Sequence, residues 1–208
     1  MKSIIIIAIS AASICLTAPL SMAAVSSGQN TATGPVESKV KSVCQTCHGL
    51  QGDSVSTAFP RLNGQKAEYV TLQLKNFRDH KRTDPHAQAY MWGMASQLDD
   101  TMIAGLAKYY ESQKPTQPQT GGALASQGQK IFLNGIAGKD VPACRKCHGE
   151  NGEGNGMFPR LAGQHADYLR IQLGAFRSTL RTNGVMHANT KDMTNSDIEA
   201  LVSFLANE

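Results

Sequence analysis

The stretch VPACRKCHGENGEGNGMFPRLAGQ, from Val141 to Gln164, is nearly repeated as VCQTCHGLQGDSVSTAFPRLNGQ, from Val43 to Gln65. Each stretch contains two cysteines separated by two residues, a histidine directly after the second cysteine, and a later Phe-Pro-Arg-Leu-x-Gly-Gln block. The same pattern of reactive residues at two places in one chain indicates an internal duplication.

The duplication extends well beyond the quoted stretches. Cys44 aligns with Cys144, and one deletion later Pro60 aligns with Pro159. The first copy then has additional residues, and after them Met91 aligns with Met186. A period near 100 residues predicts two small tandem domains, whereas a solenoid needs shorter and more numerous units.

A segment rich in proline and glycine predicts the boundary between the two domains. Prolines followed by glycines occupy residues 114–122, which is typical of an extended linker. We therefore expect a first domain over residues 25–113 and a second over residues 123–208. Residues 1–24 are expected to be a signal peptide, because Lys2 precedes a short apolar run and small residues near Ala23.

The leader predicts export to the periplasm. Its apolar run is too short to cross a bilayer, and no later segment is long and apolar enough, so we expect no transmembrane segment. Without Lys2 the mature chain keeps 19 basic against 16 acidic residues and has no basic run, so a nucleic-acid partner is not expected. We expect a monomer.

Apolar residues recur at helical spacing in both copies and predict an all-α fold. The two series are Ala67, Val70, Leu74 and Phe77, and Ala166, Leu169, Leu173 and Phe176. A last helix is expected in each domain, capped by Asp99 in the first and by a capping box at residues 194–197 in the second. Domains of about 90 residues built of short helices and long loops have marginal cores, so we expect a cofactor to fill each one.

The Cys-x-x-Cys-His pattern is typical of covalent haem attachment. Two thiols on one helical turn can reach the two vinyl groups of a porphyrin, and the next residue turns its imidazole toward the iron. The motif residues are Cys44, Cys47 and His48 in the first copy and Cys144, Cys147 and His148 in the second. All four cysteines of the mature chain lie in the motifs. The sequence therefore predicts two covalently bound haem c groups.

Three other uses of the cysteines fit the sequence less well. A zinc site usually joins Cys pairs about 15–20 residues apart, whereas Cys47 and Cys144 lie on either side of the linker. A thioredoxin-type redox pair needs a βαβ context, which the pattern lacks. Structural disulfides would suit an exported protein but leave the two motif histidines unexplained.

The sixth iron ligand determines function, because an open position permits peroxide or oxygen chemistry and a filled one leaves electron transfer. A ligand needed by both haems should occur in both copies. Among the methionines of the mature chain, Met91 and Met186 form the aligned pair, so we predict them as the distal ligands. Met94 and His187 are the local rivals.

The methionines and histidines without a counterpart in the other copy are expected to have structural roles and no function at the haems. Core filling is expected of Met94, Met102, Met157 and Met193. Surface positions are expected of His80, His86, His165 and His187.

Residues around the motifs are candidates for supporting the haems. Pro60 and Pro159 can be loop punctuation, or their loops can present a carbonyl to the Nδ1–H of His48 or His148. Arg61 and Arg160 can be surface residues, or their guanidinium groups can neutralise haem propionates. The propionates can also accept hydrogen bonds from Gln65, Gln164, Tyr69 and Tyr168. The two tyrosines can instead pack in the core. Trp92, next to Met91, is expected to pack near the first haem.

The two motifs, the two Phe-Pro-Arg-Leu-x-Gly-Gln blocks and the two late methionines resemble the dihaem cytochrome c4 family over both mature domains. The resemblance implies two class I cytochrome c folds related by an approximate twofold axis, with the propionate edges facing each other. It also implies His/Met ligation by His48, Met91, His148 and Met186, and electron transfer from a quinol-oxidising bc-type complex toward a haem-copper terminal oxidase.

One difference between the copies and two enzymatic alternatives remain. In the first domain residues 35–43 alone are plausibly helical before the motif, whereas residues 123–134 and a loop precede the second motif. The first haem is therefore expected to be more exposed, which would separate the reduction potentials of the two haems.

We expect no enzyme activity. The alternatives are a dihaem peroxidase or the haem subunit of a sulfur-compound dehydrogenase.

Overall fold

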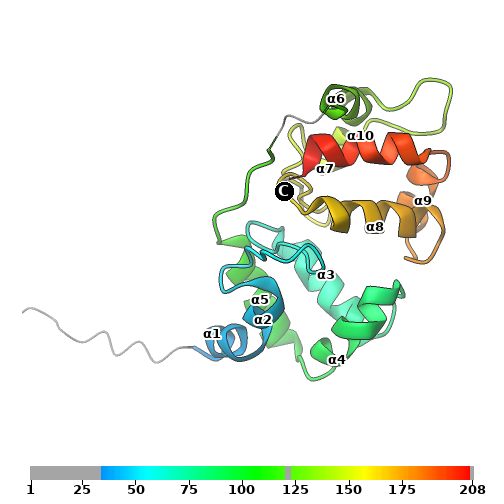
Figure 1. Cartoon of the computed structure of the whole chain (residues 1–208). Helices are drawn as coiled ribbons and strands as arrows, with labels where there is room; N and C mark the ends of the chain where they lie inside the picture. Colours follow the sequence, from blue (N-terminus) through cyan, green and yellow to red (C-terminus); the bar gives the residue numbers. More distant parts are fainter. Residues whose placement is uncertain (1–33, 120–122, 207–208) are drawn as a thin grey trace, which may run out of the picture. The chain divides into compact units, whose positions relative to one another are not determined.

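The structure is a computed structural model and describes residues 34–119 and 123–206 (Figure 1). The predicted signal peptide lies outside the described residues. Within the two described ranges, no helix is long and apolar enough to cross a membrane.

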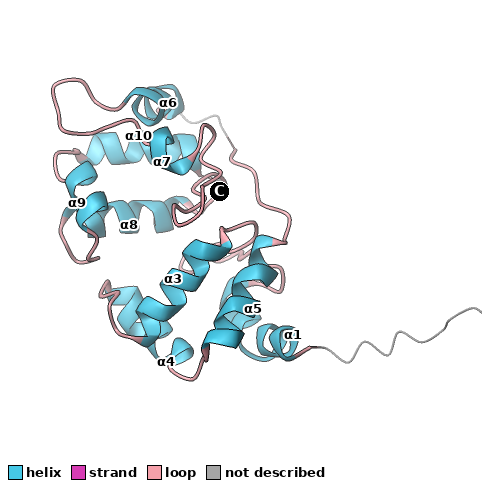
Figure 2. Cartoon of the chain, turned by 180° about the vertical axis from the view of Figure 1, so that it is seen from behind, coloured by secondary structure: helices cyan, strands magenta, loops and turns pink. Residues whose placement is uncertain are grey.

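The described residues form helices joined by loops, with isolated bridges but no sheet, as Figure 2 shows. The first half contains α1 (Pro35–Lys39), the π-helical turn η1 (Val40–Cys44), α2 (Gln45–His48), α3 (Ala67–Arg78), the π-helical turn η2 (Ala87–Met91), α4 (Trp92–Ala95) and α5 (Asp100–Glu111). The second half contains α6 (Ala125–Asn134), α7 (Arg145–His148), α8 (Ala166–Arg177), α9 (Gly184–Thr190) and α10 (Asn195–Leu205). The predicted all-α class is confirmed.

Each half builds a hydrophobic core from its own residues. In the first half Val40, Phe77 and Leu106 belong to one buried cluster. In the second half Phe132 and Leu201 belong to another. Two separate cores support the division into two domains, and the boundaries at residues 114 and 122 stay a prediction.

The last helix of each half begins at the predicted cap. The Asp99 carboxylate accepts a hydrogen bond from the Met102 N–H at 2.7 Å. At the start of α10 the Thr194 hydroxyl accepts from the Asp197 N–H, and the Asp197 carboxylate accepts from the Thr194 N–H. Both caps satisfy N–H groups that the first helical turn leaves without a partner.

The first and last helices of each half cross at a small residue. In the second half α6 packs against α10, and a Cβ on Gly128 would lie 1.9 Å from the Ala200 carbonyl oxygen (Figure 1). In the first half a Cβ on Gly105 of α5 would lie 2.4 Å from Cγ2 of Val36 in α1. Gly128 therefore permits a backbone approach that any larger residue would block.

The long helices α3 and α8 end in matching turns that position two arginines. The residue two places after each helix has a positive φ, 55° at His80 and 64° at Thr179. Such a φ is uncommon outside glycine and turns the chain back sharply. The N–H groups of Arg82 and Arg181 then bond back to carbonyls of Asn76 and Ala175 near the helix ends.

Candidate haem-binding sites

Each motif forms a short helix, α2 or α7, with its first cysteine at the N-cap position. The four motif cysteines form no disulfide with one another. Burial raises the pKa of the Cys44 thiol, and raises that of Cys144 to about 11. Within the described ranges, no three His, Cys, Asp or Glu side chains are grouped so that they could hold a metal ion such as zinc.

The motif histidines are buried, and each is held by a carbonyl of the proline loop, one of the two roles expected of Pro60 and Pro159. Nδ1 of His48 lies 2.9 Å from the Pro60 oxygen, and Nδ1 of His148 lies 2.9 Å from the Pro159 oxygen. A carbonyl can only accept, so Nδ1 carries the proton. Burial lowers the pKa of both rings and favours their neutral form.

Each neutral ring therefore keeps a lone pair on Nε2, which is the form that ligates a metal. The rings are further fixed by edge-on aromatic contacts, His48 with Phe59 at 6.1 Å and His148 with Phe158 at 6.3 Å between centroids. A buried imidazole with a defined tautomer beside two free thiols fits a covalently attached haem in both halves.

The predicted distal methionines lie on short helical segments in corresponding positions. Met91 is half-buried at the end of η2, and the helical turn that leads into η2 from Pro85 is capped by the Asp84 carboxylate, which accepts from the Ala87 N–H at 3.3 Å. Met186 is half-buried in α9, where Asn183 accepts from the Met186 N–H at 3.0 Å. Both methionines are thus presented by similarly capped segments.

The residue after each methionine is tied to backbone near the end of the long helix. The Trp92 indole N–H donates to the Arg82 carbonyl at 2.8 Å, and the ring stacks on His80 at 4.1 Å. The His187 ring bonds through Nδ1 to the Phe176 carbonyl at 3.0 Å. Of the rival ligands, Met94 is 55% exposed. The ligand assignments, and the position of Trp92 near a haem, stay predictions.

Gln65 and Gln164 bind the opposite half reciprocally. The Gln164 Oε1 accepts from the Arg61 N–H at 2.8 Å, and its Nε2 donates to the Arg61 carbonyl at 2.9 Å. The Gln65 Oε1 accepts from the Arg160 N–H at 2.7 Å, and its Nε2 donates to the Arg160 carbonyl at 3.0 Å. This exchange of identical contacts is the signature of a twofold relationship.

Neither arginine of the Pro-Arg-Leu blocks is a simple surface residue. Arg61 donates through Nη1 to the Gly163 carbonyl at 2.8 Å, and Arg160 donates through Nη2 to the Thr116 carbonyl at 3.1 Å. Burial lowers the pKa of both guanidinium groups. A role of these arginines beside propionates stays a prediction.

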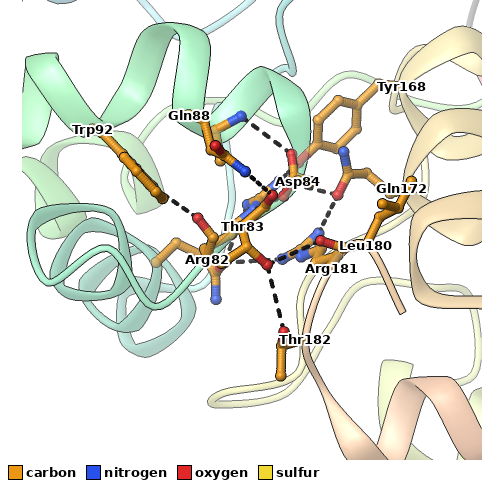
Figure 3. Close-up of polar contacts among 12 residues, drawn as sticks. Arg82, Thr83, Asp84, Gln88, Trp92, Tyr168, Gln172, Leu180, Arg181 and Thr182 are labelled. Carbon is orange, nitrogen blue, oxygen red and sulfur yellow. Dashed lines mark hydrogen bonds and ion pairs between the residues drawn. The ribbon is translucent and has the colours of Figure 1, made fainter. Parts of the chain in front are cut away.

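A second polar cluster crosses between the halves and contains two buried arginines (Figure 3). Arg82 donates through Nε to Asp84 at 2.6 Å, and its other nitrogens donate to Gln73, Tyr168 and Gln172. The partners of Arg181 are Gln172, Tyr69 and Gln73. Tyr69 and Tyr168 thus bond guanidinium groups of the opposite half.

The charges in this cluster act strongly on one another. Burial opposes ionisation of Asp84, but Arg82, Arg181 and the Ala87 N–H together outweigh it and hold the pKa of the carboxyl below its ordinary value. Burial likewise opposes ionisation of the Tyr69 hydroxyl, but Arg181 and Arg82 lower its pKa. Neither arginine was expected to have a special role, although the Arg-Thr pair occurs in both copies, as Arg82-Thr83 and Arg181-Thr182.

Three of the positions expected for the histidines and methionines without a counterpart were wrong. His165, expected at the surface, is 2% exposed and bonds through Nε2 to the Ser54 carbonyl of the other half at 2.8 Å. Met94 and Met157, expected in the core, are 55% and 63% exposed. Met193 does lie in the second core. The burial of His165 depends on contact between the halves, which a single-chain pattern does not show.

Comparison with known proteins identifies the family. The cytochrome c family model matches residues 38–114 and 125–207. The chain is 38% identical over 176 residues to cytochrome c4 of Stutzerimonas stutzeri, covering 78% of this chain and 83% of the relative. It is 36% identical over 171 residues to a thiosulfate dehydrogenase electron acceptor of Thiomonas intermedia, covering 78% and 77%.

A solved structure agrees with the sequence relatives. Cytochrome c4 of Acidithiobacillus ferrooxidans superposes with a TM-score of 0.74 at 39% identity, covering 78% of this chain and 97% of that one. Both family repeats contain a Cys-x-x-Cys-His motif, and the protein carries two covalently bound haem c groups. With one cytochrome c repeat in each half, the chain belongs to the cytochrome c4 family.

Proposed function

We propose that each half holds one haem between a motif histidine and a methionine. In the first half Cys44 and Cys47 form the thioether links, and His48 and Met91 ligate the iron. In the second half Cys144 and Cys147 form the links, and His148 and Met186 ligate the iron. The carrying observation is that both buried imidazoles donate from Nδ1 to a prolyl carbonyl, which leaves Nε2 for the metal.

The chain is a dihaem electron-transfer cytochrome, as its cytochrome c4 relatives support. The haem supplies an iron that alternates between the ferrous and ferric states. The protein's part would be to hold the histidine and methionine side chains in place and exclude water. The buried rings of His48 and His148 and the capped segments that present Met91 and Met186 support this role. A filled coordination sphere argues for a carrier and against a dihaem peroxidase.

We place the carrier in the periplasm, delivered by the signal peptide at residues 1–24 and working as a monomer. It would accept electrons from a quinol-oxidising bc-type complex and pass them to a haem-copper terminal oxidase. The resemblance to cytochrome c4 supports this direction. Methionine ligation supports it as well, because a thioether favours ferrous iron and raises the potential.

A second source of electrons is a sulfur-compound dehydrogenase, with this chain as its acceptor. Relatives from Thiomonas intermedia and Stutzerimonas stutzeri are named thiosulfate dehydrogenase electron acceptors, at 36% and 34% identity. Such a role leaves the haem sites unchanged and alters the partner alone.

Rapid-mixing kinetics distinguishes the two donors. The oxidised protein is mixed with quinol and a bc-type complex, or with thiosulfate and a thiosulfate dehydrogenase, and the appearance of the ferrous spectrum is followed. Faster reduction by the bc-type complex supports the respiratory direction. Reduction by the dehydrogenase alone would replace that direction with the acceptor role.

A further inference from the structure

One peptide group in each half connects an axial histidine to a glutamine of the other half. The Pro60–Arg61 peptide accepts from His48 Nδ1–H through its oxygen at 2.9 Å. The N–H of the same peptide donates to the Gln164 Oε1 at 2.8 Å. The imidazole, the peptide and the carboxamide therefore form one continuous chain of hydrogen bonds.

The second half repeats the arrangement with the halves exchanged. The Pro159–Arg160 peptide accepts from His148 Nδ1–H at 2.9 Å, and its N–H donates to the Gln65 Oε1 at 2.7 Å. The duplication thus produces two crosswise chains, each running from one imidazole to a side chain of the opposite half.

Backbone groups fix the orientation of both carboxamides. Each Nε2 faces a carbonyl, of Arg61 for Gln164 and of Arg160 for Gln65, so it must be the donor. Each Oε1 faces a second N–H, from His165 or Lys66, at 3.0 Å. An exchange of the amide oxygen and nitrogen would break all of these contacts, so the acceptor at each peptide N–H is defined.

The surroundings favour transmission along these chains. Gln65 and Gln164 are 6% and 7% exposed. The cavity that they line together with Arg61, Arg160 and neighbouring residues has a volume of about 10 Å³, about the space of one water. Where the bonded groups are buried as these glutamines are, consecutive hydrogen bonds polarise and strengthen one another.

We propose that each glutamine tunes the axial histidine of the opposite half through the intervening peptide. Acceptance of the Arg61 N–H by Gln164 places more negative charge on the Pro60 oxygen. That oxygen then accepts more strongly from His48, which makes the imidazole a better electron donor to iron and favours the ferric state. Gln65 acts in the same way on His148. The two glutamines are positioning residues, and the inference rests on the proposed His48 and His148 ligation.

The test uses the holoprotein with Gln164→Leu and Gln65→Leu, which are matched by the internal symmetry. A redox titration followed by NMR of the haem methyl signals gives the potential of each haem. We expect Gln164→Leu to raise the potential of the first haem and Gln65→Leu that of the second. The ferrous-to-ferric ratio of the affected haem at a fixed potential should rise about two- to tenfold, less than the 10–100-fold effects typical of direct ligand partners.

A direct readout of the hydrogen bond accompanies the titration. In the ferrous protein the Nδ1–H proton signal of His48 should move upfield in Gln164→Leu, because its hydrogen bond weakens, while that of His148 stays in place. Gln164→Glu retains an acceptor for the Arg61 N–H and adds negative charge. It should therefore lower the potential of the first haem.

The outcomes separate the relay from a loosened interface. Equal shifts of both haems in each leucine variant, or a raised first potential in Gln164→Glu, would overturn the relay. Unchanged potentials and proton signals would overturn it as well. If the wild type itself lacks histidine–methionine spectra, the proposed ligation fails first, and that result is visible before any glutamine is changed.

Discussion

Replacing Asp84 by asparagine tests the buried cluster of Figure 3. The Asp84 side chain is 1% exposed and that of Arg82 is 8% exposed, with 2.6 Å between Oδ1 and Nε. Asparagine keeps an oxygen for the Ala87 N–H, so the variant removes the charge and preserves the cap, as Asn183 does for α9. Arg82 then remains buried without its carboxylate.

The expected loss is at the lower end of what breaking a buried pair costs. Removing one partner typically costs 3–5 kcal/mol, since it leaves an uncompensated buried charge. Arg82 retains its bonds to Gln73, Tyr168 and Gln172, which solvate part of that charge. We therefore expect the free energy of unfolding to fall by about 3 kcal/mol. For a chain of this size this lowers Tm by roughly 6–12 °C.

The pH dependence gives an independent check. The pKa of Asp84 is below its ordinary value in the folded state, and about 3.9 when unfolded. The pair thus stabilises the protein above about pH 4 and its contribution is lost as pH falls through the folded pKa. The difference between wild type and Asp84→Asn should be constant from about pH 5 to 7 and shrink below about pH 4.

Urea denaturation of the holoprotein, followed by circular dichroism at several pH values, measures both effects. Asp100→Asn is the control, because Asp100 pairs with Lys75 and Arg78 at the surface and should show a far smaller loss. An Asp84→Asn variant within about 1 kcal/mol of wild type, with a difference independent of pH, would refute the reasoning.

Three further perturbations probe other parts of the structure. Gly128→Ala should lower the free energy of unfolding in urea by about 1–3 kcal/mol, because the new Cβ would clash with the Ala200 carbonyl; unchanged stability would contradict the close crossing. Asp99→Ala should cost about 1 kcal/mol by loss of the α5 cap, measured in the same way. Met91→Leu should remove half of the near-infrared thioether-to-iron charge-transfer band of the ferric protein, whereas Met94→Leu should leave it intact; the reverse result would reassign the ligand.

The sequence predicted the local features of this fold because they depend on residues close together in the chain. Helical spacing gave α3 and α8, and the caps at Asp99 and Thr194 follow from side chains three residues from their N–H partners. A carbonyl from the loop at Pro60 was one of two expected roles, because proline recurs there in both copies and has no N–H of its own.

The contacts between the halves were not predicted, because their partners lie about 100 residues apart. Gln65 and Gln164 repeat in the sequence and are candidates for hydrogen bonds to propionates, but their bonds to the backbone of the opposite half were not expected. His165 aligns with Lys66, a residue type that is usually exposed. The Ser54 carbonyl that bonds to the His165 ring comes from the other half. Internal repetition marked the important positions without naming their partners.

The central claim is that both irons have a histidine on one side and a methionine on the other, which suits a carrier and leaves no site for a substrate. Exposure of the fully reduced, folded protein to carbon monoxide at neutral pH tests it most directly. If both coordination spheres are filled, the ferrous spectrum should stay unchanged at both haems. Ready formation of a carbon monoxide complex at either haem would contradict it.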